Sequence, residues 1–124
     1  MQNIYIVEDD QNISEIEFFA LKNAGFNPVC FENYSAFQKA MQENLPHLVI
    51  LDIMLPGMDG LEVLRCIREE GITSRFIILS GYNDFSLAQK AIRHGANAYF
   101  LKPLKVDEFK DELSRQFADI LASG

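Results

Sequence analysis

The chain has 124 residues, a net charge of −7, 48% hydrophobic residues and 23% charged residues. This length suits one domain with a single core, and the composition is that of a globular protein rather than a disordered one. The acidic excess argues against direct binding of DNA or RNA by this segment, because phosphate backbones would be repelled. We find neither a signal peptide pattern nor the roughly 20 consecutive apolar residues that span a bilayer, so we expect a cytoplasmic domain without membrane contact.

Short apolar segments rich in Val, Ile, Phe and Tyr recur along the chain. They are apolar at successive positions, which is typical of strands in a parallel sheet that is covered on both faces. The predicted strands cover residues 4–7, 28–31, 48–51, 76–79 and 98–101.

Amphipathic segments with helical spacing of their apolar residues follow each of these strands. Glycines after three of them (Gly25, Gly71 and Gly95) are expected helix stops, and Asp84 is a candidate N-cap. The repeated strand–helix order predicts an α/β fold: a doubly wound five-stranded parallel sheet of the flavodoxin-like type, with strand order 2-1-3-4-5. The apolar residues that define the helices run from Ile13 to Ala24, Phe37 to Met41, Leu61 to Ile67, Ala88 to Ile92 and Val106 to Ile120.

Two cysteines, Cys30 and Cys66, lie inside these periodic segments. Disulfide scaffolds use more cysteines in shorter chains. We therefore expect both thiols to be reduced and to lie in or near the core.

Polar residues follow the predicted strands at the ends where an open α/β sheet binds its ligands. Carboxylates gathered there would repel one another without a cation, and Mg²⁺, or Mn²⁺, is the natural counter-charge. An ammonium and a hydroxyl opposite the metal would suit phosphoryl oxygens, with a carboxylate as the attacking group. The residues in question are Glu8, Asp9 and Asp10 after the first strand, Asp52 after the third, Ser80 after the fourth and Lys102 after the fifth.

Each of these features alone also has a purely structural interpretation. The acids after the first strand can cap a helix, and Asp52, Ser80 and Lys102 can each be turn or surface residues. Their joint occurrence at the correct strand ends favours a phosphoryl and Mg²⁺ site.

The chain resembles the receiver domain of bacterial response regulators along its whole length, which implies one receiver domain over residues 1–124 and an output domain, if any, outside this chain. The motifs that carry the resemblance are Ile6-Val7-Glu8-Asp9-Asp10, Leu51-Asp52-Ile53-Met54-Leu55-Pro56-Gly57-Met58-Asp59-Gly60, Ile78-Leu79-Ser80-Gly81 and Tyr99-Phe100-Leu101-Lys102-Pro103.

The resemblance implies a Mg²⁺-dependent phosphoacceptor. Asp52 would take the phosphoryl group from a sensor histidine kinase or a phosphotransfer protein. Asp9, Asp52 and the backbone carbonyl of Met54 would bind the metal, with Glu8 acting through water. Lys102 would pair with the phosphoryl group.

The resemblance also implies a conformational switch that uses the Ser80 hydroxyl and the Tyr99 ring. Met54 and Tyr82 would flank the approach of the water that hydrolyses the aspartyl phosphate. The Lys102–Pro103 peptide bond would be cis.

The expected function is a signalling switch rather than a conventional enzyme, with transcription as the favoured output and a homodimer possible on phosphorylation. Glu112 stands where the winged-helix subgroup usually has an arginine, which disfavours that subgroup's dimer. Three alternatives stay open: an aspartyl-phosphate hydrolase, which would want an acid where Met54 stands, a flavin-binding electron carrier, and a degenerate receiver that acts as an interaction module. The acids at Glu8 and Asp9 would repel a flavin phosphate.

Overall fold

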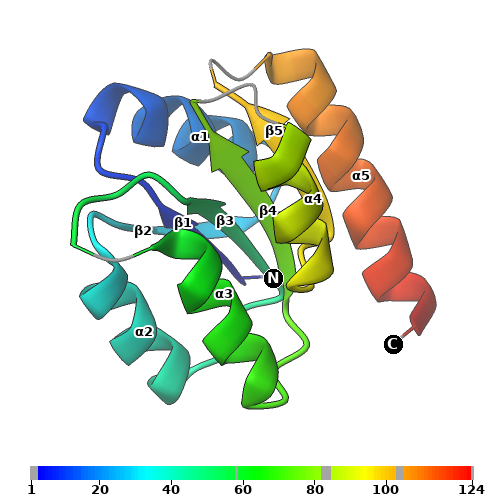
Figure 1. The fold of residues 1–124 in the computed structure, drawn as a ribbon. Coiled ribbons are helices and arrows are strands. Elements are labelled where there is room, and N and C mark those ends of the chain that lie inside the picture. Colours follow the sequence, from blue (N-terminus) through cyan, green and yellow to red (C-terminus); the bar gives the residue numbers. More distant parts are fainter. Residues whose placement is uncertain (1–2, 58, 82–84, 103–104, 124) are drawn as a thin grey trace.

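A computed structural model describes residues 3–57, 59–81, 85–102 and 105–123. The described strands are all parallel and form one sheet in the order β2-β1-β3-β4-β5, which confirms the predicted fold class and strand order (Figure 1). The elements are β1 (Asn3–Val7), α1 (Gln11–Asn23), β2 (Asn27–Phe31), α2 (Tyr34–Glu43), β3 (Leu48–Asp52), α3 (Gly60–Glu69), β4 (Arg75–Ser80), α4 (Phe85–Arg93), β5 (Ala98–Leu101) and α5 (Val106–Ser123).

Helices cover both faces of the sheet (Figure 1). Successive strand residues point to opposite faces, so each strand contributes to two cores. Ile4 and Ile6 pack on the face that α1 and α5 cover, with Leu21 and Phe109. The other core lies under α2, α3 and α4. Its members include Tyr5, Val7, Phe37, Leu51, Leu64, Phe76 and Ala91.

Burial differs between the central and the edge strands. Every residue of β3 is buried, whereas in β2, at one edge of the sheet, Val29 keeps 39% of its surface exposed. The expectation that all strands are covered on both faces is therefore wrong for β2. Cys30 is exposed for the same reason, which corrects its expected place in or near the core. Cys66 is half-buried, and both thiols are free.

The helix ends follow the local sequence. The Asp10 side chain caps α1 by accepting hydrogen bonds from the backbone N–H groups of Asn12 (2.9 Å) and Ile13 (3.2 Å). Gly25 and Gly95, after α1 and α4, have φ angles of 93° and 103°, values that residues with a side chain rarely adopt. The predicted N-cap Asp84 lies outside the described residues.

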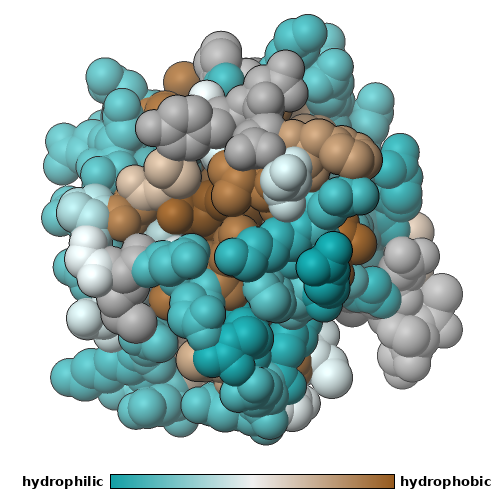
Figure 2. Space-filling model, viewed as in Figure 1, coloured by the Kyte–Doolittle hydropathy of each residue, from teal (hydrophilic) through white to brown (hydrophobic). Residues whose placement is uncertain are grey.

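Hydrophobic side chains also reach the surface. Figure 2 shows such side chains gathered between α3 and α4, among mostly hydrophilic neighbours. On α4 itself, Phe85 is 76% exposed and Ile92 is also exposed. No helix in the described part of the chain has both the length and the hydropathy of a membrane span.

Candidate functional site

The sheet brings acidic residues from two neighbouring strands together at its carboxyl edge. Glu8 and Asp9 follow β1, and Asp52 is the last residue of β3. One carboxylate oxygen from each of these three residues lies within 4.8 Å of the others. The strand order explains this cluster, because β1 and β3 are adjacent in the sheet although their first residues, Asn3 and Leu48, are 45 positions apart in the chain.

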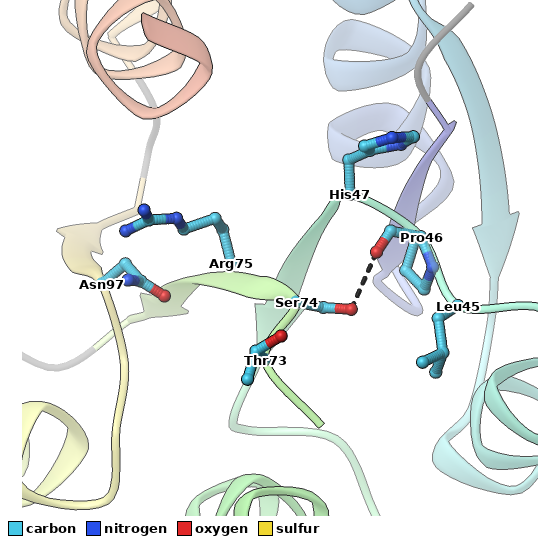
Figure 3. A pocket seen from close by; sticks show the side chains of 7 residues that line it. All are labelled: Leu45, Pro46, His47, Thr73, Ser74, Arg75 and Asn97. Atoms are coloured by element: carbon cyan, nitrogen blue, oxygen red, sulfur yellow. Dashed lines mark hydrogen bonds between the residues drawn. The ribbon is translucent and has the colours of Figure 1, made fainter. Parts of the chain in front are cut away.

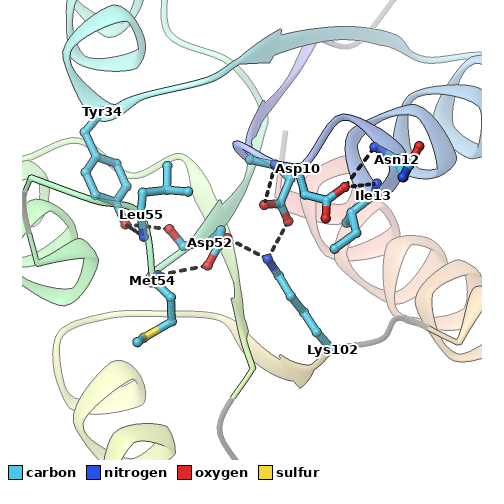
Figure 4. Close-up of polar contacts among 9 residues, drawn as sticks. Asp10, Asn12, Ile13, Tyr34, Asp52, Met54, Leu55 and Lys102 are labelled. Carbon is cyan, nitrogen blue, oxygen red and sulfur yellow. Dashed lines mark hydrogen bonds and ion pairs between the residues drawn. The ribbon is translucent and has the colours of Figure 1, made fainter.

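The Asp52 carboxylate is buried and fixed at both oxygens (Figure 4). Its Oδ1 accepts a hydrogen bond of 2.8 Å from the backbone N–H of Met54. Its Oδ2 accepts a hydrogen bond of 2.5 Å from the Lys102 Nζ. The first bond sets the orientation of the carboxylate, and the second places a cation beside it.

Lys102 bridges two buried acids. Its Nζ lies 2.6 Å from Glu8 Oε1 in an ion pair and also contacts Asp52. Burial works against the ammonium charge, but the hydrogen bonds to Asp52 and Glu8 outweigh it and raise the pKa of Lys102. The backbone N–H of Lys102 donates to the carbonyl of Ser80 at 2.9 Å, which ties the end of β5 to the end of β4.

The crowding of carboxylates disfavours the ionised form of Glu8. Burial, followed by the neighbouring Asp52 carboxylate, raises the pKa of Glu8 to about 7, although Lys102 opposes the shift. The described site therefore holds more acidic groups than one lysine compensates. A hard divalent cation with oxygen ligands would supply the missing positive charge, so the residues present fit Mg²⁺.

The other predicted site residues lie as follows. Asp9 is exposed and belongs to the acidic cluster, whereas the Asp10 side chain is used by the cap of α1. Ser80 is fully buried at the end of β4, and Tyr99 is half-buried against the core under α2, α3 and α4. The Met54 side chain is 46% exposed at the rim of the site. Tyr82 and Pro103, and with them the expected cis bond, lie outside the described residues.

Tyr34 supports the site in a way that the sequence did not reveal. Its hydroxyl donates a 2.6 Å hydrogen bond to the Asp52 carbonyl and accepts a longer one, 3.4 Å, from the backbone N–H of Leu55 (Figure 4). This side chain from the start of α2 thus fixes the backbone on both sides of the turn after β3. Nothing in the local pattern around Tyr34 distinguishes it from an ordinary core aromatic residue.

Glu17 is a second residue that the sequence did not single out. It lies on the buried face of α1 with 1% of its surface exposed, and neither carboxylate oxygen has a hydrogen-bond partner within the described residues. Burial, and then the charge of Glu8, raises the pKa of Glu17 to about 8. Lys102 opposes this shift and Asp52 adds to it, so Glu17 lies within the electrostatic reach of the acidic cluster.

Known proteins are similar to this chain in both sequence and fold. The sequence profile of the response regulator receiver domain matches residues 4–114. Response regulator protein TodT of Pseudomonas putida is 34% identical over 105 residues, and the DNA-binding transcriptional regulator NtrC of Escherichia coli is 33% identical over 105 residues. A receiver domain structure from Methanospirillum hungatei superimposes with a TM-score of 0.92 at 22% identity, covering 100% of this chain and 99% of that one.

The matched region is only part of the two relatives. The alignments cover 85% of this chain but 46% of TodT and 22% of NtrC. The chain thus corresponds to less than half of either relative.

Proposed function

Because the chain belongs to the response regulator receiver domain family of two-component signalling, we propose that Asp52 is its phosphoacceptor and that phosphorylation switches its conformation. The observation that carries this proposal is the environment of Asp52. Its buried carboxylate is oriented by the Met54 N–H, contacts Lys102 and lies beside Glu8 and Asp9.

In the proposed reaction, an Asp52 carboxylate oxygen attacks the phosphorus of a phosphohistidine on a histidine kinase or phosphotransfer protein. A phosphorus–oxygen bond forms and the phosphorus–nitrogen bond breaks, leaving its electron pair on the imidazole nitrogen. Lys102 Nζ, now 2.5 Å from Asp52 Oδ2, transfers its contact to a phosphoryl oxygen. The Ser80 hydroxyl also donates a hydrogen bond to a phosphoryl oxygen. Positioning and charge neutralisation are the main requirements of such a transfer.

The proposed metal ligands are Asp9, Asp52 and the backbone carbonyl of Met54, with Glu8 acting through water. When bound, Mg²⁺ or Mn²⁺ would neutralise phosphoryl oxygens during transfer. The acidic cluster supports this proposal, because one carboxylate oxygen from each of Glu8, Asp9 and Asp52 already lies within 4.8 Å of the others.

The proposed output is control of transcription through a further domain, because relatives of this chain are named as transcriptional regulators. Ser80 and Tyr99 would transmit the change, and a homodimer could form on phosphorylation. We propose a cytoplasmic signalling domain that assists its own phosphorylation and dephosphorylation rather than a conventional enzyme. Met54, which cannot transfer a proton, stands where an aspartyl-phosphate hydrolase would use a second acid.

Metal-dependent phosphorylation tests this function. The chain is incubated with acetyl phosphate, with Mg²⁺ or with a chelator, and phosphate incorporation is measured. Asp9→Asn should reduce incorporation at limiting Mg²⁺ by about tenfold or more, because it removes a charged metal ligand.

Asp10→Asn is the matched control for this experiment. Asn caps a helix as well as Asp does, so this variant should keep both α1 and normal incorporation. Incorporation that is unaffected by the chelator, or equal in Asp9→Asn and Asp10→Asn, would rule out the proposed metal site.

A further inference from the structure

A hollow of about 440 Å³ lies at the amino edge of the sheet, opposite to the acidic cluster. The loops that precede β3, β4 and β5 form it, and its volume lies in the range of small-molecule sites. Figure 3 shows Arg75 and Asn97 on one side of the hollow and His47 on the other, with Ser74 between them. The lining residues are Leu45, Pro46, His47, Thr73, Ser74, Arg75 and Asn97.

The charge of this hollow is opposite to that of the chain. The net charge of the chain is −7, yet the ionisable residues that line the hollow are Arg75 and His47, and no acid lines it. Within the described residues, Arg75 has no ion pair or side-chain hydrogen bond, so its guanidinium is available to a ligand.

A second guanidinium reinforces this charge. Arg68 donates to the carbonyls of Gly95 and Ile72 and to Asn97 Oδ1, all of which are uncharged. Burial, and then the positive charge of Arg75, lowers the pKa of Arg68. The two arginines therefore lie close enough to repel each other, and an anion would relieve this repulsion.

The internal hydrogen bonds leave mainly donors facing the hollow. His47 Nδ1 accepts a 3.3 Å bond from the Asn3 N–H, so the proton of a neutral imidazole must lie on Nε2. Asn97 Oδ1 accepts from the Phe76 N–H at 2.9 Å, which leaves the Asn97 amide nitrogen to donate. The Pro46 carbonyl, also drawn in Figure 3, is occupied because it accepts a 2.7 Å hydrogen bond from the Ser74 hydroxyl.

We propose that this hollow is a binding site for a small phosphate-bearing molecule, held by Arg75, His47 and Asn97. A guanidinium fork matches phosphate oxygens, and donors on opposite sides suit a tetrahedral group whose oxygens point in several directions. The site is separate from the acidic cluster, since the two occupy opposite ends of the parallel strands. Its ligand therefore needs neither a divalent cation nor Asp52.

Titration of the whole chain with inorganic phosphate and with pyrophosphate, in the presence of a chelator, tests the proposal. Amide proton–nitrogen spectra should show saturable shifts confined to residues 45, 47, 73–75 and 97, with sodium chloride at equal ionic strength producing none. Arg75→Gln should weaken binding by about tenfold, the usual effect of losing a charge-assisted contact. His47→Leu should weaken it several-fold.

Arg93→Gln is the matched control, because Arg93 is an exposed arginine on α4 that does not line this hollow. It should bind like the parent chain. The proposal is wrong if no saturable shifts occur at the three loops, if chloride reproduces them, or if Arg75→Gln and Arg93→Gln have the same effect. The spectra also report directly whether each variant is folded.

Discussion

At the scale of single residues, Lys102 is shared between the Asp52 and Glu8 carboxylates. A phosphoryl group on Asp52 would compete with Glu8 for this ammonium. Glu17, on α1, makes no hydrogen bond with Lys102; it is buried and has no hydrogen-bond partner among the described residues. A buried carboxyl of this kind is expected to be neutral below its raised pKa and to cost stability when it ionises.

We predict that Glu17 lowers the stability of the fold as pH rises from about 5 to 8. The folded chain keeps the Glu17 proton up to a pKa of about 8, whereas the unfolded chain releases it near the ordinary value of 4.5. The unfolded state therefore binds fewer protons in this window, and stability falls with pH. At about 1.4 kcal/mol for each pKa unit, the loss is on the order of 4 kcal/mol.

Urea unfolding between pH 5 and 8 measures this loss. Glu17→Gln keeps the shape of the side chain but cannot ionise, so its unfolding free energy should decline less over the same range. The remaining decline would include Glu8, whose pKa is raised to about 7. Parallel pH profiles for the parent chain and Glu17→Gln would contradict the assignment.

We propose that Met54 influences the lifetime of the phosphorylated state. Its thioether cannot orient an attacking water by a strong hydrogen bond, and it is large enough to crowd the approach to Asp52. We predict that Met54→Asn speeds phosphate release by about tenfold, or about 1.4 kcal/mol in the barrier. Leu45→Asn is the control, because Leu45 has a similar exposure, 54% against 46%, at the opposite edge of the sheet. Acceleration of less than about threefold in Met54→Asn would show that this side chain does not set the lifetime.

At the scale of elements, the start of α3 packs tightly against the turn that follows Asp52. A Cβ at Gly60 would lie 2.5 Å from the Ile53 Cα and 2.6 Å from the Tyr34 hydroxyl. Any side chain here would displace the tyrosine that holds the Asp52 carbonyl.

We predict that Gly60→Ala destabilises the fold by at least about 2 kcal/mol, because the added methyl group would clash with the Ile53 backbone, which can move only at a cost in strain. This loss should outweigh the better helix propensity of alanine, which is worth up to about 1 kcal/mol. Gly81→Ala is the control, since a Cβ there would meet nothing within 4 Å, and its effect should stay within about 0.5 kcal/mol. Chemical denaturation compares the two, and equal stabilities would show that the turn adapts to the added methyl.

The sequence predicted the elements well where local pattern decides them. All five strands were placed within one residue of their observed ends, because the apolar strand segments and the glycines that stop three of the helices are marked in the local sequence. The exposure of β2 was missed although the predicted strand order already placed this strand at an edge, because its apolar segment by itself has the pattern of a strand that is buried on both faces. The acidic cluster was predictable because strand ends converge, whereas the roles of Tyr34 and Glu17 depend on contacts between distant elements.

At the scale of the whole molecule, the proposed switch must connect the carboxyl edge with the surface of α4, β5 and α5. Ser80 is the last residue of β4, Lys102 directly follows the adjacent strand β5, and the Lys102 N–H donates a hydrogen bond to the Ser80 carbonyl. Tyr99 lies in β5, close to Lys102 in the chain, and packs against the core under α4. The exposed Phe85 and Ile92 give α4 an apolar surface, and we propose that a partner binds there and responds to the change.

We predict that beryllofluoride with Mg²⁺ changes the amide spectra of Tyr99, α4 and α5 as well as those of the strand ends. The complex mimics the phosphoryl group, so it should shift the population between two packings of this face. Asp52→Asn, which lacks the charged acceptor, should show none of these changes. Shifts confined to the residues next to Asp52 would mean that this surface is not coupled to the site.

The most direct test of the account is the site of phosphorylation itself. Intact-mass spectrometry after reaction with acetyl phosphate and Mg²⁺ should show one added phosphoryl group on the parent chain and none on Asp52→Asn. Asp59→Asn, which keeps an N-cap residue at the start of α3, should be modified like the parent. Normal phosphoryl uptake by Asp52→Asn would contradict the account.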